Sequence, residues 1–279
     1  MSRLREVVQR YPILAFVALA CLFGWAIWIG VFLSGGTGGI NLPIAPIIAA
    51  LIVASCQGRD ELRAWARRLR SWRADPKWYL LAVLAPVVLH VLIVLVNGGL
   101  GAPLPTSDQL SHWPDVPGTF VVLLVLIGIG EEAGWTAFMA PILLRRHGLL
   151  VAWAIASVVR ILWHVPLMIS GDLDMVLGTV GNAAFTMVLL MLLVVRGGNW
   201  SLAAVWHASL NSAGGSFFFT MVDGADATRL SLLMSAEYAV VAGLAYLAAR
   251  RQDSPLDGVD RRRHDTGGTH VDRHAPTHL

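Results

Sequence analysis

The chain has 279 residues, of which 56% are hydrophobic and only 14% are charged, and its mean hydropathy is +0.64. This composition excludes an ordinary water-soluble globular protein and provides enough apolar sequence for many membrane spans. The formal net charge of +3 comes from basic residues in loops and tail, which report membrane topology and give no reason to expect a nucleic-acid partner. The only cysteines, Cys21 and Cys56, lie in or beside apolar runs, and their spacing does not predict a structural disulfide.

Eight apolar runs approach the length of about 20 residues that a helix needs to cross roughly 30 Å of hydrocarbon. They cover approximately residues 12–33, 40–56, 78–97, 118–144, 149–169, 175–195, 200–222 and 230–249. The second run is short and has Pro43 and Pro46 near its start. The pattern predicts an all-α membrane protein in which residues 1–249 form an eight-helix transmembrane bundle.

Basic residues alternate between successive loops. The N-terminal arm and the loops after the second, fourth, sixth and eighth runs hold Arg3, Arg5, Arg10, Arg59, Arg63, Arg67, Arg68, Arg70, Arg73, Lys77, Arg145, Arg146, Arg196, Arg250 and Arg251. The intervening loops, 34–39, 98–117, 170–174 and 223–229, contain only Arg229. Because cytoplasmic loops accumulate Lys and Arg, this alternation predicts that both termini are cytoplasmic. The basic loops can also lie against anionic lipid headgroups.

The last segment, residues 250–279, is polar and rich in Gly, Pro, His and charges of both signs. It has no apolar surface to bury, so we expect a disordered cytoplasmic tail. Its histidines are irregularly spaced, which favours a solvated tail over a metal-binding tract.

Two adjacent carboxylic acids interrupt the fourth apolar run, in the sequence GIGEEAGW that begins at Gly128. On insertion scales each such charge costs roughly 2.5–3.5 kcal/mol at the centre of a bilayer, and some ten aliphatic neighbours barely offset the pair. The apolar sequence FMAPILL that follows argues against a helix end at the membrane surface. Glu131 and Glu132 therefore indicate a function, because they do not serve stability.

Further polar side chains occur in the fifth and seventh runs. Arg160 and His164 are four residues apart, so they share one helix face. The same spacing, and hence the same arrangement, holds for His207 and Asn211. At 1.5 Å per residue these groups and the glutamates reach comparable depths, which predicts that the three helices meet at one intramembrane site.

Two other polar residues have a simpler explanation. His90 lies one turn after Pro86 and can bond to carbonyl groups that the proline leaves free, so a structural role is favoured. Glu237 has no motif partner and is not assigned to the site.

A carboxylate pair, two imidazoles and an amide can activate water and stabilise an oxyanion, with or without a divalent metal. Three segments carry these residues: EEAGWTAFMAPIL from Glu131, ILWHVPL from Ile161 and LAAVWHASLN from Leu202. Their order and spacing resemble the CPBP family of intramembrane proteases, which comprises CAAX prenyl endopeptidases, bacteriocin-processing proteins and abortive-infection proteins. The resemblance covers about residues 118–215.

The resemblance implies an intramembrane endopeptidase that hydrolyses a peptide bond in a cavity open to the cytosol or the lipid. Glu131 would activate a water together with His164. His207 and Asn211 would polarise the scissile carbonyl and hold the oxyanion. Glu132 would orient these groups or share a proton with its neighbour, because like charges that close seldom both ionise.

The requirement for a metal stays open at this stage. Members of the family are described as metalloproteases, and the resemblance implies Glu131, His164 and His207 as possible ligands of a divalent ion such as zinc. The sequence contains no HExxH motif, and the same residues could simply bind water.

Two positions depart from the family pattern. Thr136 stands where the family usually has Arg, four residues after the second Glu, and Arg160 stands where it usually has Phe, four residues before the middle His. We hypothesise that Arg160 supplies, from the neighbouring helix, the cation that steadies the carboxylate pair.

Two other functions compete with the protease. The departures allow a catalytically inactive membrane scaffold or immunity factor. Buried acids and histidines also form proton relays in transporters, although the inverted repeats of such proteins are not visible here. The expected partners are a peptide or membrane-protein substrate, prenylated or not, and membrane lipid.

Overall fold

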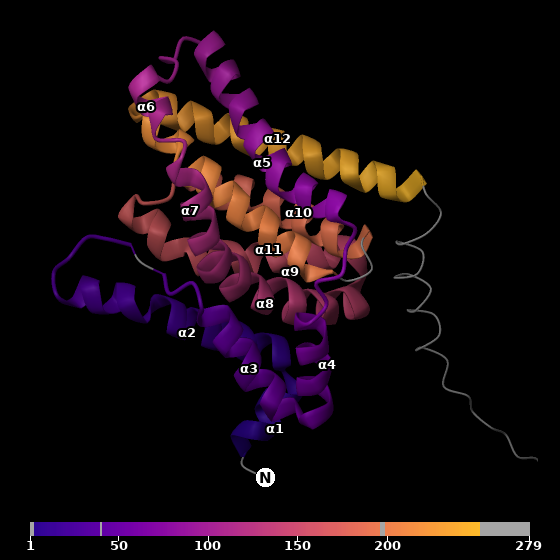
Figure 1. Ribbon diagram of the computed structural model, residues 1–279. Helices are drawn as coiled ribbons and strands as arrows, with labels where there is room; N and C mark the ends of the chain where they lie inside the picture. Colours follow the sequence, from indigo (N-terminus) through magenta and orange to yellow (C-terminus); the bar gives the residue numbers. More distant parts are fainter. Residues whose placement is uncertain (1–2, 40, 196–198, 252–279) are drawn as a thin grey trace, which may run out of the picture.

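The computed structural model describes residues 3–39, 41–195 and 199–251 (Figure 1), so most of the predicted tail lies outside the described part. The described chain is helical and contains no strand. Its α-helices are α1 (Arg3–Arg10), α2 (Pro12–Leu33), α3 (Ala45–Gln57), α4 (Arg59–Leu69), α5 (Pro76–Gly99), α6 (Ser107–Ser111), α7 (Asp115–Leu123), α8 (Gly130–Gly134), α9 (Ala140–Ser170), α10 (Asn182–Val195), α11 (Trp200–Leu210) and α12 (Gly224–Arg251).

Short segments of other helix types join several of these α-helices. Four are π-helical: η1 (Leu124–Ile129), η2 (Trp135–Met139), η3 (Leu177–Gly181) and η4 (Asn211–Gly215). The fifth is a 3₁₀ turn, η5 (Phe218–Met221). A π-helical turn accommodates an extra residue and therefore changes the direction in which the following side chains point.

Five helical stretches within the described residues are long and apolar enough to cross a membrane: Pro12–Leu33, Pro76–Gly99, Asp115–Ser170, Leu177–Val195 and Gly224–Arg250. The prediction of an all-helical membrane protein is therefore confirmed, whereas the count of eight spans stays a prediction.

Several of the eight predicted runs differ from these five stretches for local reasons. The fourth and fifth runs form one helical stretch, bent at Gly148, whose φ of 72° and ψ of 176° depart from helical values. Glycine adopts this positive φ without steric cost. The seventh run is divided, because α11 ends at Leu210 and gives way to η4 and η5. The second run is represented by α3, which has only 13 residues.

Helix α11 is the central helix of the bundle, because it packs against α5, α8, α10 and η1 (Figure 1). Helix α8 in turn packs against α3. Glycines permit these close approaches: a Cβ atom at Gly128 would lie 2.7 Å from the Ala204 carbonyl oxygen, and one at Gly134 would lie 2.6 Å from the Pro46 backbone. Small residues at such contacts let helix backbones approach closely in a membrane. The glycines beside the two glutamates thus place α8 in the interior.

The Gly134→Ala variant tests this packing. We expect it to lose about 1–3 kcal/mol of stability, because the added methyl group has no room against α3. The Gly30→Ala variant is the matched control: a methyl group added to this helical glycine would meet no neighbour within 4 Å, so the change should be neutral or stabilise by about 0.5–1 kcal/mol. Thermal unfolding in detergent measures both, and equal unfolding temperatures would contradict the proposed close contact.

Candidate functional site

Both glutamates of the fourth run lie on α8 and are buried, with 4% of Glu131 and none of Glu132 exposed. Successive residues of an α-helix point about 100° apart, so the two carboxylates face different surroundings. Glu131 lines a cavity, whereas Glu132 points into the protein toward α9 and α11.

Glu132 is held by three donors. Nη1 of Arg160 lies 2.9 Å from its Oε1, and Nδ1 of His207 lies 2.8 Å from the same oxygen. The hydroxyl of Thr136, one turn further along the chain, donates to Oε2. Helices α9 and α11 and the η2 segment therefore converge on a single carboxylate.

Arg160 lies where the hypothesis stated above, that it supplies the cation for the carboxylate pair, requires a positive charge. Its side chain is buried, and its guanidinium carbon lies 5.5 Å from the ring centre of Phe185 and 6.0 Å from that of Trp135. Aromatic faces stabilise a desolvated guanidinium through cation–π attraction. Thr136 is the other departure from the family pattern. Its small hydroxyl lies one helical turn from Glu132 and donates a hydrogen bond to that carboxylate.

Glu131, the first glutamate of the motif, lies close to the same imidazole. Ligand atoms of Glu131, Glu132 and His207 all lie within 4.8 Å of one another. Nε1 of Trp135 donates to Oε2 of Glu131 across 3.3 Å. Because Nδ1 of His207 faces Glu132, its Nε2 is the ring nitrogen that stays available to the cavity.

His164 enters the cavity from α9. Its Nδ1 lies 2.6 Å from the carbonyl oxygen of Arg160 and 2.9 Å from the side-chain amide of Asn182. A carbonyl can only accept, so the contact with Arg160 places the hydrogen on Nδ1, and Nδ2 of Asn182 lies against the same nitrogen. This arrangement leaves Nε2 of His164 without a proton and able to act as a base.

Sequence reasoning missed Asn182. It is buried at the first position of α10 and lines the same cavity. The available signal was an amide inside an apolar run, in the sequence GNAAF, but a search limited to ionisable groups passes over it.

Asn211, the first residue of η4, also lines the cavity. One hydrogen of its Nδ2 is donated to the carbonyl oxygen of His207, at 3.0 Å. The second amide hydrogen can therefore serve as a donor within the site.

These side chains surround one cavity of about 500 Å³. Its polar lining consists mainly of Asn41, Glu131, Arg160, His164, Asp172, Asp174, Asn182, His207, Asn211 and Ser231. Apolar residues from several helices, including Leu167 and Phe185, complete the wall. All the predicted catalytic residues except Glu132 line this space, and Glu132 supports it from behind.

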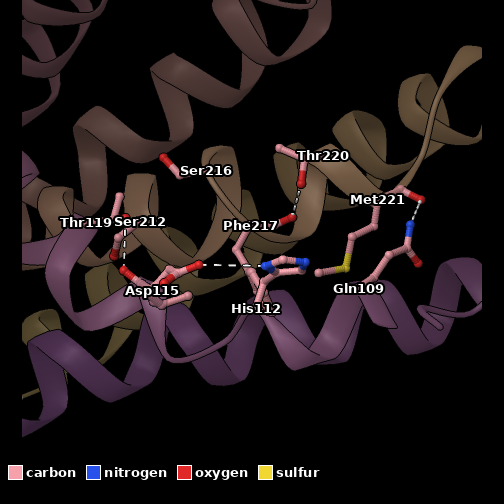
Figure 2. Close-up of a pocket in the computed structure, with 10 residues that line it drawn as sticks. Gln109, His112, Asp115, Thr119, Ser212, Ser216, Phe217, Thr220 and Met221 are labelled. Carbon is pink, nitrogen blue, oxygen red and sulfur yellow. Dashed lines mark hydrogen bonds and ion pairs between the residues drawn. The ribbon is translucent and has the colours of Figure 1, made fainter. Parts of the chain in front are cut away.

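Figure 2 shows a second, smaller cavity of about 270 Å³ between the α6–α7 region and the η4–η5 region. Nδ1 of His112 lies 3.7 Å from Oδ2 of Asp115 there, and both side chains are exposed. The two cavities share no lining residue: Ser212 faces the smaller one and Asn211 the larger, so η4 forms the wall between them.

The two residues excluded from the site on sequence grounds do not line the large cavity. Nδ1 of His90 lies 2.6 Å from the carbonyl oxygen of Pro86, and its ring stacks near Phe218. Glu237 belongs to α12 and is likewise absent from the cavity lining.

The residues that could hold a metal differ from the predicted set. The sequence resemblance suggested Glu131, His164 and His207, whereas the group that the structure assembles has Glu132 in place of His164. A carboxylate bonded to one nitrogen of a histidine is a common support for metal binding by the other nitrogen, and Glu132 occupies that position behind His207. Glu131 and Nε2 of His207 therefore fit a divalent ion as direct ligands, with Glu132 as the support of the imidazole, and these ligands do not specify the identity of the ion.

Residues 113–213 match the protein-family model described as Type II CAAX prenyl endopeptidase Rce1-like. This segment of the chain is therefore similar to CAAX prenyl endopeptidases of that type. The matched segment begins just before α7 and ends in η4, so it includes every catalytic residue predicted from the motifs and nearly coincides with the predicted core of residues 118–215. No curated protein matches the chain.

Within the matched segment, the Arg160→Phe variant tests the hypothesis that Arg160 supplies the cation for the carboxylate pair. It should lose about 3–5 kcal/mol of stability, because Glu132 would stay buried without its positive partner. The double variant Thr136→Arg with Arg160→Phe should recover most of that loss by returning the cation from η2. Thermal unfolding of the wild type and both variants provides the measurement. A harmless single change would show that Glu132 needs no cation from α9.

Proposed function

We propose that the chain is an intramembrane endopeptidase of the CAAX-protease type, which hydrolyses a peptide bond of a membrane-associated or prenylated substrate. One observation carries the proposal: Glu131, His164, His207 and Asn211 come from different helices of the family-matched segment and face one cavity. The cavity volume of about 500 Å³ can accommodate several residues of an extended peptide together with water.

In the proposed mechanism, a water molecule between Glu131 and His164 attacks the scissile carbonyl. Glu131 accepts a proton from this water, while the unprotonated Nε2 of His164 orients it. The proton is then delivered to the nitrogen of the departing amine, so that the two products leave as an acid and an amine. The carbonyl oxygen of Arg160 keeps His164 in the required tautomer, and the amide of Asn182 helps to position the ring.

The oxyanion that forms during the attack needs donors on the opposite side. His207, oriented through Nδ1 by Glu132, would donate to the oxyanion from Nε2. The amide of Asn211 supplies a second donor from the next helical turn.

A divalent ion fits the same chemistry. Glu131 and His207 would hold it, with Glu132 orienting the imidazole. Such an ion would acidify a bound water and polarise a carbonyl.

We further propose that the chain crosses the membrane eight times, with both termini in the cytoplasm. The bend at Gly148 supports two spans within the stretch Asp115–Ser170. The alternation of basic loops supports the orientation.

The departures at Thr136 and Arg160 favour one alternative, a catalytically inactive scaffold or immunity factor with the same fold. The two functions differ in whether the site turns over. A proton-coupled transporter is a weaker alternative, because the polar groups gather in one cavity and the sequence shows no internal repeat.

The Glu131→Gln variant distinguishes these functions. Since Gln cannot accept the proton, hydrolysis should fall by about 10²–10⁴-fold while the unfolding temperature stays close to that of the wild type. The Glu237→Gln variant is the matched control, because it changes a membrane carboxylate that does not line the cavity. Cleavage of a library of membrane peptides by the reconstituted full chain provides the measurement. Equal activity of wild type and Glu131→Gln would favour the scaffold.

Asn182 provides a test of how His164 is positioned. The Asn182→Leu variant should lower kcat by about 10–100-fold with little change in KM, because the His164 ring loses the amide that helps to hold its orientation. The Asn182→Asp variant keeps a polar side chain of the same shape at that place and should retain more activity than the Leu variant. If both variants fail equally, Asn182 supports packing alone.

A further inference from the structure

The large cavity reaches the surface at one end of the bundle. Its outermost lining residues are Gly39, Asp172, Leu173 and Asp174, from the loops that follow α2 and α9. The carboxylate of Asp172 is exposed and joins the two loops, because it accepts hydrogen bonds from the N–H of Gly39 at 2.7 Å and from the hydroxyl of Ser170 at 2.6 Å. These two bonds hold the pKa of Asp172 below its usual range, so that at neutral pH this carboxylate stays ionised and keeps the loops together. We call this opening the mouth.

The other residues that line the large cavity also lie toward the mouth end of the bundle. On α10 and its preceding η3 segment the cavity touches the first turns, near Leu177 and Asn182. On α11 it touches the last residues and the η4 segment, near Asn211. On α12 it touches the beginning, at Ser231 and Met234. All of these helix ends adjoin loops of the group 34–39, 98–117, 170–174 and 223–229.

The Arg-rich segments gather at the opposite end. Nε of Arg5 donates to the Cys56 carbonyl oxygen at the end of α3, and Nε of Arg68 donates to that of Ala137 in η2. Nδ2 of Asn199, just before α11, donates to the Arg73 carbonyl oxygen. None of the Arg-rich segments contributes a residue to the lining of the large cavity.

The loops at the mouth end have the opposite charge. They contain Asp108, Asp115, Asp172, Asp174, Asp223 and Asp226, with Arg229 as the only Arg or Lys. Because cytoplasmic loops accumulate Lys and Arg, the basic end is cytoplasmic and the mouth faces away from the cytoplasm. This direction differs from an opening to the cytosol, which was one of the two openings expected from the sequence.

We propose that the large cavity receives its substrate from the extracytoplasmic face, and that this substrate is an apolar peptide segment near the outer end of a membrane span. This inference rests on the proposed function, since it names the substrate class of the same site. The walls next to the mouth supply the apolar surface for such a segment: Leu167, Leu173, Leu177, Phe185, Leu210 and Phe219. A prenylated C-terminus in the cytoplasm would meet the Arg-rich end of the bundle, whose segments contribute none of the residues that line the large cavity.

Cysteine labelling tests the direction of the mouth independently of hydrolysis. Cys21 and Cys56 are first replaced by Ala in the full chain, and a single cysteine is then introduced as Leu173→Cys at the mouth or as Ser71→Cys in the exposed loop after α4. A charged maleimide that does not cross membranes is added to intact cells that express each variant. We expect Leu173→Cys to be labelled and Ser71→Cys to be labelled only after the cells are permeabilised. The reverse pattern would overturn the inference and leave the protease proposal intact.

A second measurement tests whether the mouth is the route of the substrate. After labelling of permeabilised cells, in which both introduced cysteines are accessible, membranes are prepared and the hydrolysis of reconstituted single-span substrates is compared. The bulky label at Leu173→Cys should abolish hydrolysis of a substrate whose apolar scissile segment lies at its outer end, whereas a label at Ser71→Cys should leave that rate unchanged. Unchanged hydrolysis in the labelled Leu173→Cys protein would overturn the proposed route. If the unlabelled protein hydrolyses no substrate, the protease proposal fails, and the substrate assignment fails with it.

Discussion

The architecture of the site depends on one fully buried carboxylate, that of Glu132. An isolated charge in such surroundings is strongly unfavourable, and it is tolerated only when partners and hydrogen bonds satisfy it. Arg160, His207 and Thr136 meet that demand from α9, α11 and η2. The need to neutralise one side chain therefore fixes the mutual position of the three helical segments that carry these partners, and with them the remaining site residues.

The π-helical segments explain how these helices present their side chains. Each of them adjoins a site residue: η1 ends just before the two glutamates, η2 contains Thr136, η3 ends just before Asn182, and η4 begins with Asn211. A π-helical turn forfeits regular hydrogen bonding and persists where surrounding contacts support it. Its repeated occurrence around one cavity indicates that the packing of the bundle determines where the side chains point, at the expense of helix regularity.

Much of this arrangement could be predicted from the sequence, and the part that could not has a physical cause. Apolar length predicted a helical membrane protein, and four-residue spacing predicted that His164 and His207 would each share a helix face with a polar partner. Spacing carries no signal for a π-helical turn, which arises from tertiary contacts. The sequence therefore could not predict the division of the seventh run after Leu210 or the role of Asn182, because both depend on how neighbouring helices meet.

The adjacency of the two glutamates assigns them different tasks. Glu132 is neutralised by Arg160, so the pair of acids and the single guanidinium leave one formal negative charge, which belongs to Glu131 at the cavity wall. That charge has two uses open to it, the acceptance of a proton from water or the binding of a divalent cation. A guanidinium delivered from α9 instead of η2 leaves this balance unchanged. Exchange of a cation between two neighbouring helical segments can therefore preserve the electrostatics of such a site, although both sequence motifs are altered.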